Sequence, residues 1–265
     1  DLFQKGQDGK ISGFLRDAAV MGTAMDISAS QAGDWAAKWE KAFNMTHGEI
    51  MVLADQINYL GANSATTAAE IAQVVNDAAS LGQVAGIDVS TTAALADAML
   101  ATGVGSDKVA TSVKRTITNL SKGTSATKAM KEQWEELGFT ADGVARAMQE
   151  DSIGALNEVF MAIGNLPDYK QVAALSTLFG QWAIEGNAKV VGNMSVFQDA
   201  LDMVGDPGKY AGSMEREFAI KAGTSENIDL MVGNAFRAMK IKVGDSFLPM
   251  KKEIGQGLVS VIDGA

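Results

Sequence analysis

The sequence contains no cysteine, one histidine and three prolines. The absence of cysteine excludes a disulfide framework and a thiolate zinc site. With His47 as the single histidine, a metal site built from several histidines is excluded, and only one imidazole could serve as a catalytic base. No apolar run approaches the ~18 residues that a membrane span needs. We therefore expect no metal centre, no bound cofactor and no transmembrane span in this segment.

Positive charge and aromatic side chains are also scarce. The formal net charge of −10 argues against nucleic-acid binding, because phosphate contacts need clustered Lys and Arg. Aromatic residues make up 6% of the chain, although 47% is apolar, which is enough for a sizeable core. Ala, Gly and Met are abundant, so we expect closely packed helices, gaps filled by Met, and modest stability. The sequence does not start with Met and ends in "VSVIDGA", which we interpret as a piece of a longer protein.

Sharp corners between helices are the most regular feature of the sequence. In "ELGFTADGVARAM" (136–148), one helix is expected to end at Gly138 and the next to begin at Thr140. Glycine adopts the left-handed conformation that closes a helix without a Cβ clash. Phe139 would then pack back on the finished helix, and the Thr140 hydroxyl would accept from an unpaired N–H of the next one.

The same arrangement recurs along the first half of the chain. It is present in 85–99 and 102–113, and Asp26 or Asn44 takes the place of the glycine further upstream. Thr46 and Ser28 each begin an S/T-x-x-E/Q capping box. The expected N-cap residues are Ser28, Thr46, Ser90, Ser106 and Thr140.

Apolar residues recur with the helical period, and no stretch alternates with the period of a strand. We therefore predict an all-α fold, with many short capped helices in a compact domain over 1–205. A long amphipathic helical arm over 206–265 is predicted to follow. The expected helices are 10–25, 28–43, 47–61, 67–83, 90–101, 106–121, 125–137, 140–149, 152–164, 168–179, 181–203, 209–221 and 225–262.

The arm carries an apolar stripe that is too long to remain in water. We predict a helix-pairing interface there, either between copies of the chain or with its own core, and a bend at Pro249. The interface residues are Met231, Val232, Phe236, Met239, Phe247 and Leu248.

Candidate catalytic and ligand-binding residues are few, and each fits a structural role better. His47 is expected to be an exposed residue of a first helical turn. The "QKGQDGKI" stretch (4–11) lacks the carboxylates of an EF-hand and is interpreted as a loop before a helix. A group of acidic residues could supply the two carboxylates of a glycosidase, but we interpret it as a solvent-exposed helix face. That group consists of Glu132, Glu135, Glu136 and Asp142.

The order of these corners resembles the core region of phage tail tape-measure proteins from about Ala18 to Val204. The resemblance is carried by "MDISASQAGDWAAKWEKAFNMTHGEIMVLADQ", "AGIDVSTTAALADAMLATGVGSDKVATSV", "WEELGFTADGVARAM" and the Leu-Phe-Gly at 178–180. It implies a structural virion protein without catalytic residues in this region. Such a protein sets tail tube length during assembly in the host cytoplasm and leaves the tube lumen at genome ejection.

The resemblance also implies the partners. They are other copies of the chain, the tail tube protein, tail assembly chaperones, and baseplate or tail-tip proteins. Two alternatives remain open at this point: a peptidoglycan-degrading segment of a tail protein, and a helical adaptor unrelated to phage that binds amphipathic partners through Met-rich grooves.

Overall fold

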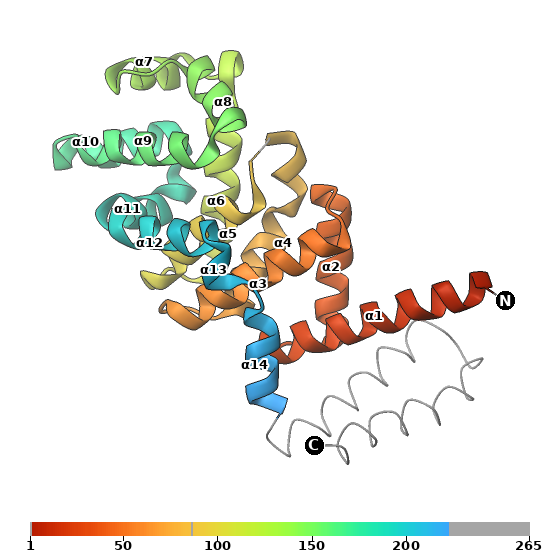
Figure 1. Cartoon of the computed structure of the whole chain (residues 1–265). Coiled ribbons are helices and arrows are strands. Elements are labelled where there is room, and N and C mark those ends of the chain that lie inside the picture. Colours follow the sequence, from red (N-terminus) through yellow and green to blue (C-terminus); the bar gives the residue numbers. More distant parts are fainter. Residues whose placement is uncertain (1, 86, 223–265) are drawn as a thin grey trace.

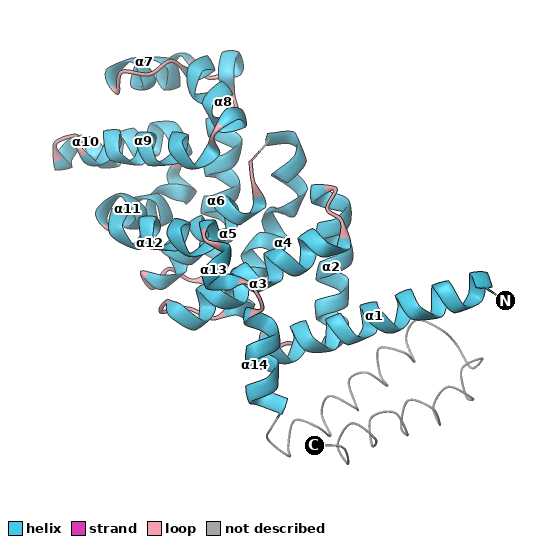
Figure 2. Cartoon of the chain, in the orientation of Figure 1, coloured by secondary structure: helices cyan, strands magenta, loops and turns pink. Residues whose placement is uncertain are grey.

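A computed structural model describes residues 2–85 and 87–222, apart from the side chains of 2–12, 80 and 82–85 (Figure 1). Over these residues it contains helices joined by turns and no strand, which confirms the all-α prediction (Figure 2). The α-helices are α1 (Leu2–Ala24), α2 (Ala29–Phe43), α3 (His47–Asn63), α4 (Ala68–Ala85), α5 (Val89–Ala101), α6 (Ser106–Leu120), α7 (Lys128–Glu136), α8 (Ala141–Glu150), α9 (Ser152–Gly164), α10 (Asp168–Phe179), α11 (Ile184–Gly192), α12 (Met194–Gly205), α13 (Pro207–Tyr210) and α14 (Ser213–Ala222). Two 3-10 turns are η1 (Gly123–Ser125) and η2 (Gln181–Ala183).

Four of the predicted left-handed corners are confirmed, and the one expected in 85–99 falls on residue 86, outside the described residues. Asp26 and Asn44 have φ of 57° and 53°, and Gly103 and Gly138 have φ of 84° and 85°. At the last corner the Phe139 N–H donates to the carbonyl of Trp134 at 2.8 Å. The two rings meet edge to face with centroids 6.2 Å apart, so Phe139 packs back on the finished helix as expected.

Three of the five expected N-caps are confirmed. The side chains of Ser28, Thr46 and Thr140 accept from the backbone N–H three residues on. Of the two predicted capping boxes, Thr46 forms the full one with Glu49, whereas Ser28 makes only the first of the two bonds.

The prediction for Ser106 is wrong, because Gly105 is the N-cap of α6 and no side chain caps that helix. The prediction for Ser90 is wrong, because α5 begins earlier and Asp88 caps it by accepting from Thr91 N. The Ser90 hydroxyl instead donates to Gln56 Oε1 at 2.7 Å.

Some predicted boundaries are wrong as well. The helix expected over 181–203 is divided into η2, α11 and α12, with a break at Asn193. The Asn193 amide donates to the carbonyl of Lys189 at 2.9 Å, a local bond that competes with continuation of the helix. The loop expected over 4–11 belongs to α1, which begins at Leu2.

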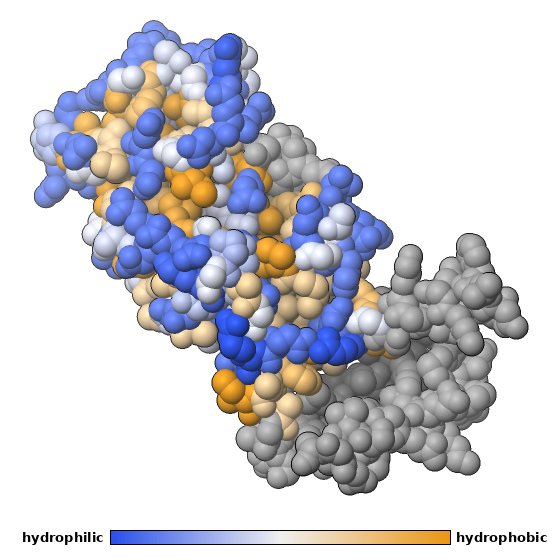
Figure 3. Space-filling model, viewed as in Figure 1, coloured by the Kyte–Doolittle hydropathy of each residue, from blue (hydrophilic) through white to orange (hydrophobic). Residues whose placement is uncertain are grey.

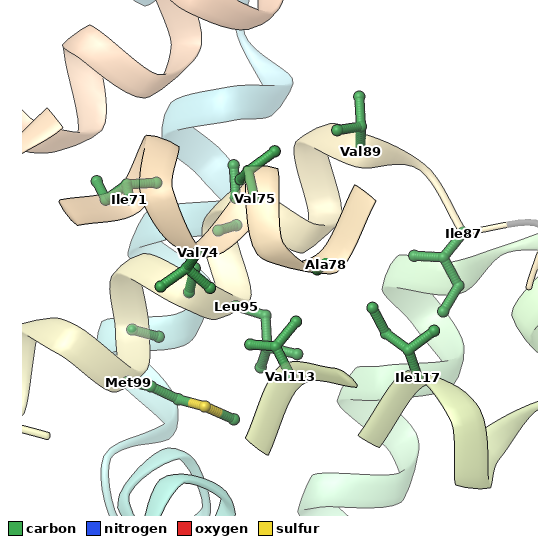
Figure 4. Close-up of a cluster of buried hydrophobic side chains, with 14 of the residues drawn as sticks. Ile71, Val74, Val75, Ala78, Ile87, Val89, Leu95, Met99, Val113 and Ile117 are labelled. Carbon is green, nitrogen blue, oxygen red and sulfur yellow. The ribbon is translucent and has the colours of Figure 1, made fainter. Parts of the chain in front are cut away.

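Helix α5 is the centre of the core. It packs against α3, α4, α6, α11 and α12, and Val89 and residues 91–100 are all buried. Its leucine and methionine side chains meet valines of α4 and α6, such as Val74 and Val113 (Figure 4). Four buried alanines in 93–98 let the neighbouring helices approach closely.

The helices form an elongated body with α1 and α14 at one end and α7 to α10 at the other (Figure 1). Helix α14 packs against α1 and α3, so residues 207–222 lie on the same body as the preceding helices. The remainder of the predicted arm, 223–265, lies outside the described residues. The division of the chain into domains at residue 205 therefore stays a prediction.

Candidate interaction sites

The only histidine lies in an exposed network of charges. His47 begins α3, and its Nε2 is 2.7 Å from Asp17 Oδ2 of α1. Arg16 contacts the same carboxylate and also Glu215 of α14, at 2.8 Å. The network joins three helices at one end of the body, which gives His47 a structural role. Within 2–85 and 87–222, no three carboxylate or imidazole side chains are arranged to hold a metal ion.

Three of the four acidic side chains of the α7 and α8 group are paired with cations. Glu136 accepts from Lys170 Nζ at 2.7 Å, and this bond holds the pKa of the Glu136 carboxyl below its usual value. A general acid for glycoside cleavage needs a raised pKa instead. Asp142 pairs with Arg146, and Glu132 with Lys128, on exposed faces of their own helices. The interpretation as a solvated face agrees with these contacts.

Helix α3 holds the last described helices through polar side chains. The two carboxylate oxygens of Asp55 accept from the N–H groups of Gly212 and Met214, each at 2.8 Å. These N–H groups lie at the start of α14, where a helix leaves its donors unpaired. Asn58 donates to Ser213 Oγ at 2.8 Å, and Gln56 donates to the carbonyl of Val204 at 2.8 Å. Asp55 therefore caps α14 from a helix that is more than 150 residues away in the sequence.

A pocket of about 470 Å³ lies between the α2–α3 corner and the segment that leads into α5. Its lining is mostly apolar, with Glu49 and Asp88 as the two carboxylates. Both carboxylates cap helices, which fixes their positions. The remaining lining residues are Phe43, Met45, Val52, Leu53, Gln56, Ile87, Val89 and Ser90. Val52 is 45% exposed, so part of this apolar surface faces solvent.

Large apolar side chains are also exposed at both ends of the body. On α10 and η2, Tyr169 is 78% and Trp182 is 74% exposed. On α14, Ile220 is 70% exposed, and apolar residues gather at the end of that helix (Figure 3). Exposed Trp and Tyr are typical of protein interfaces, so these positions are candidates for contact with other chains.

Sequence reasoning missed the buried Asp97 in the middle of α5. Only 1% of this residue is exposed, and Ser64 Oγ donates to its Oδ1 at 2.5 Å. Burial raises the pKa of Asp97 to about 6. A signal was present in "AALADAML" (93–100), where one carboxylate interrupts an otherwise apolar helix.

The predicted helix-pairing residues cannot be placed. Met231, Val232, Phe236, Met239, Phe247 and Leu248 all lie outside the described residues. None of the helices that the structure describes has the length and apolar character needed to cross a bilayer.

Comparison with known proteins decides the family. A family model described as "Phage-related minor tail protein" matches residues 1–180. The chain belongs to this family. This minor tail protein is also 35% identical over 212 residues to a "Probable tape measure protein" of Halomonas phage phiHAP-1. The match covers 80% of the chain and 25% of that relative, so the chain spans about a quarter of the relative's length. No solved structure matches the chain significantly.

The comparisons confirm the resemblance that the corners of the sequence indicate. The family match covers the stretch from Ala18 to the Leu-Phe-Gly at 178–180, on which most of that resemblance rests. The chain is thus a structural protein of the phage tail and a virion component.

Proposed function

We propose that this chain is a segment of a tape-measure protein that sets tail tube length during assembly and leaves the tube at genome ejection. The observation that carries the proposal is the 35% identity to a probable tape-measure protein over most of the chain. On this reading the segment lies in the tube lumen of the virion, and in the host cytoplasm during assembly. Its partners are further copies, the tube protein, tail assembly chaperones, and baseplate or tail-tip proteins.

Short helices with local caps are compatible with both a compact and an extended form of the chain. As one continuous helix, 265 residues would reach about 400 Å, whereas a compact chain of that length has a radius of gyration of about 18 Å. Bonds such as Thr140 Oγ1 to Gly143 N link residues three apart, so they do not depend on tertiary packing. We infer that each short helix keeps its cap when the body opens, and that opening removes mainly the contacts between helices.

A structural role without catalysis is part of this proposal. Three of the four acidic side chains considered as a glycosidase pair, Glu132, Glu136 and Asp142, are paired with a neighbouring cation. No observation on the described residues favours peptidoglycan cleavage. The chain should give no clearing in a zymogram on cell walls, and a clearing band would contradict this part of the proposal. The family match favours a tail protein over a helical adaptor unrelated to phage.

The arm remains part of the proposal. We infer that 1–205 act as the helical domain and 206–265 as the arm, whose first part, 207–222, packs on that domain as α13 and α14. We also infer that the apolar stripe of the arm packs on other helices, through Met231, Val232, Phe236, Met239, Phe247 and Leu248. Burying such side chains is worth about 1.5–3 kcal/mol each compared with leaving them exposed. Limited proteolysis of the full chain should therefore spare the arm, and immediate digestion of 223–265 would contradict its burial.

Tail length in assembled virions tests the role as a ruler. An in-frame duplication of this segment within the full protein should lengthen the tail by about 1.5 Å per added residue if the segment is extended in the tube. Electron microscopy of negatively stained virions measures the change against the parental phage. Normal particles with unchanged tails would contradict the proposal.

A further inference from the structure

We propose that the pocket between the α2–α3 corner and the start of α5 binds the chain's own C-terminal arm, through apolar side chains of residues 236–252. The proposal concerns the packing of the arm and does not depend on the role in tail length. It rests on the lining of the pocket, on the charges of pocket and arm, and on where the arm leaves the body.

The pocket has the size and lining of a binding site for apolar side chains. Its volume of about 470 Å³ lies within the usual range of ligand pockets, about 300–1,000 Å³. Phe43, Met45 and Val52 come from one side, and Ile87 and Val89 from the other. Methionine is flexible and can adjust to an incoming aromatic or aliphatic group.

The charge of the pocket favours the basic part of the arm as its occupant. Glu49 and Asp88 line the pocket, and bonds from Thr46 lower the pKa of Glu49, which keeps it ionised at neutral pH. Within 237–252 the arm has one carboxylate, Asp245, and five cationic side chains. These are Arg237, Lys240, Lys242, Lys251 and Lys252, in a chain with a net charge of −10. Met239, Phe247 and Leu248 are thus apolar residues in the most basic part of the arm.

The arm starts close enough to reach the pocket. The first turn of α14 is bonded to Asp55, on the same helix whose residues Glu49 to Gln56 line the pocket. Helix α3 has 17 residues and is about 25 Å long. Phe247 follows Ala222 by 25 residues, or about 37 Å as a helix. Because the segment is tethered, its effective concentration at the pocket is in the millimolar range, which favours the chain's own arm over that of a second copy.

Cysteine cross-linking tests the contact directly, because the chain has no cysteine of its own. The full chain carrying Val52→Cys and Phe247→Cys should form an intrachain disulfide under mild oxidation. Val172→Cys with Phe247→Cys is the matched control, since Val172 is a similarly exposed valine on α10, at the other end of the body. Intrachain cross-linking at least tenfold faster than in the control is expected. Equal rates would overturn the proposal, and so would a disulfide formed mainly between two chains.

A second variant separates docking from folding. Val52→Arg places a cation in the pocket, and it should release the arm so that chymotrypsin cleaves after Phe247 about tenfold faster. Val172→Arg should leave that rate unchanged, and circular dichroism should show equal helix content in both variants. An unchanged cleavage rate in Val52→Arg would overturn the proposal.

Discussion

Ser64 donates a hydrogen bond of 2.5 Å to Asp97, and this bond is the polar contact of a carboxylate buried in the central helix. Ser64 follows the last turn of α3, so the bond joins the end of one helix to the middle of another. One hydroxyl does not replace the water that an ionised carboxylate loses on burial. The pKa of Asp97 is accordingly raised to about 6, above the ordinary value near 3.8.

The first prediction concerns pH. Because the folded-state pKa of Asp97 is raised, the folded chain binds a proton between about pH 6 and pH 4 that the unfolded chain does not bind. This group should therefore add about 2–3 kcal/mol to the free energy of unfolding as the pH falls through that window. Asp97→Asn should remove this contribution and be more stable than the natural chain at pH 8. Urea denaturation of both proteins from pH 8 to pH 4.5 measures the free energy of unfolding. If it changes with pH in the same way in both proteins, Asp97 does not have a raised pKa.

A second prediction concerns the corner at Gly138. A Cβ there would meet no atom within 4 Å, so the effect of Gly138→Ala comes from its φ of +85° alone. The substitution should lower the free energy of unfolding by about 1–2 kcal/mol. Gly48→Ala is the control, because that glycine lies in α3, also has open space around it, and should gain up to about 1 kcal/mol. Equal thermal shifts for the two variants would argue against a left-handed corner.

A third prediction concerns the close crossing of α6 and α11. A Cβ at Gly186 would lie 2.7 Å from Ser112 Cβ and 2.8 Å from Met99 Sδ. Gly186→Ala should therefore cost about 1–3 kcal/mol through overpacking. Gly192→Ala, in the same helix with nothing within 4 Å, should cost nothing comparable. Adding Ser112→Gly to Gly186→Ala should recover much of the lost stability. If the losses of the two single variants simply add in the double variant, the contact between residues 112 and 186 is not the cause.

A fourth prediction concerns the attachment of α14. Asp55→Ala leaves the N–H groups of Gly212 and Met214 without their acceptor, which should cost about 1–3 kcal/mol. Glu132→Ala, which removes an exposed partner of Lys128 at 3.6 Å, should change stability by less than about 0.5 kcal/mol. Hydrogen exchange should quicken in 212–222 for Asp55→Ala alone. Unchanged protection there would show that other contacts hold α14.

Local features of the fold could be predicted from the sequence because their causes lie within a few residues. The helix corners depend on residues that tolerate a left-handed backbone, which are Asp26, Asn44 and Gly138. The N-caps depend on short polar side chains, which Thr46 and Thr140 supply. The boundaries of α9 and α10 match the predicted ranges 152–164 and 168–179, because the residues that begin and end these helices are also local signals.

Long-range contacts could not be predicted, because they depend on how helices far apart in sequence meet. Asp88 displaced Ser90 as the cap of α5, since Gln56 of α3 engages the Ser90 hydroxyl. The capping of α14 by Asp55 and the pairing of His47 with Asp17 likewise have no signature in the spacing of those residues. The pocket is formed by two corners that are about 40 residues apart, so composition gives no sign of it.

The burial of α5 on nearly every side sets an order for mechanical unravelling. A pulling force on either end of the described body reaches α1 or α14 first, and these helices lie at its periphery (Figure 1). Helix α5 contacts five other helices and is released only after its covering layers have peeled away. A single-molecule stretching record should accordingly show small early steps from the outer helices and one larger rupture when α5 loses its neighbours.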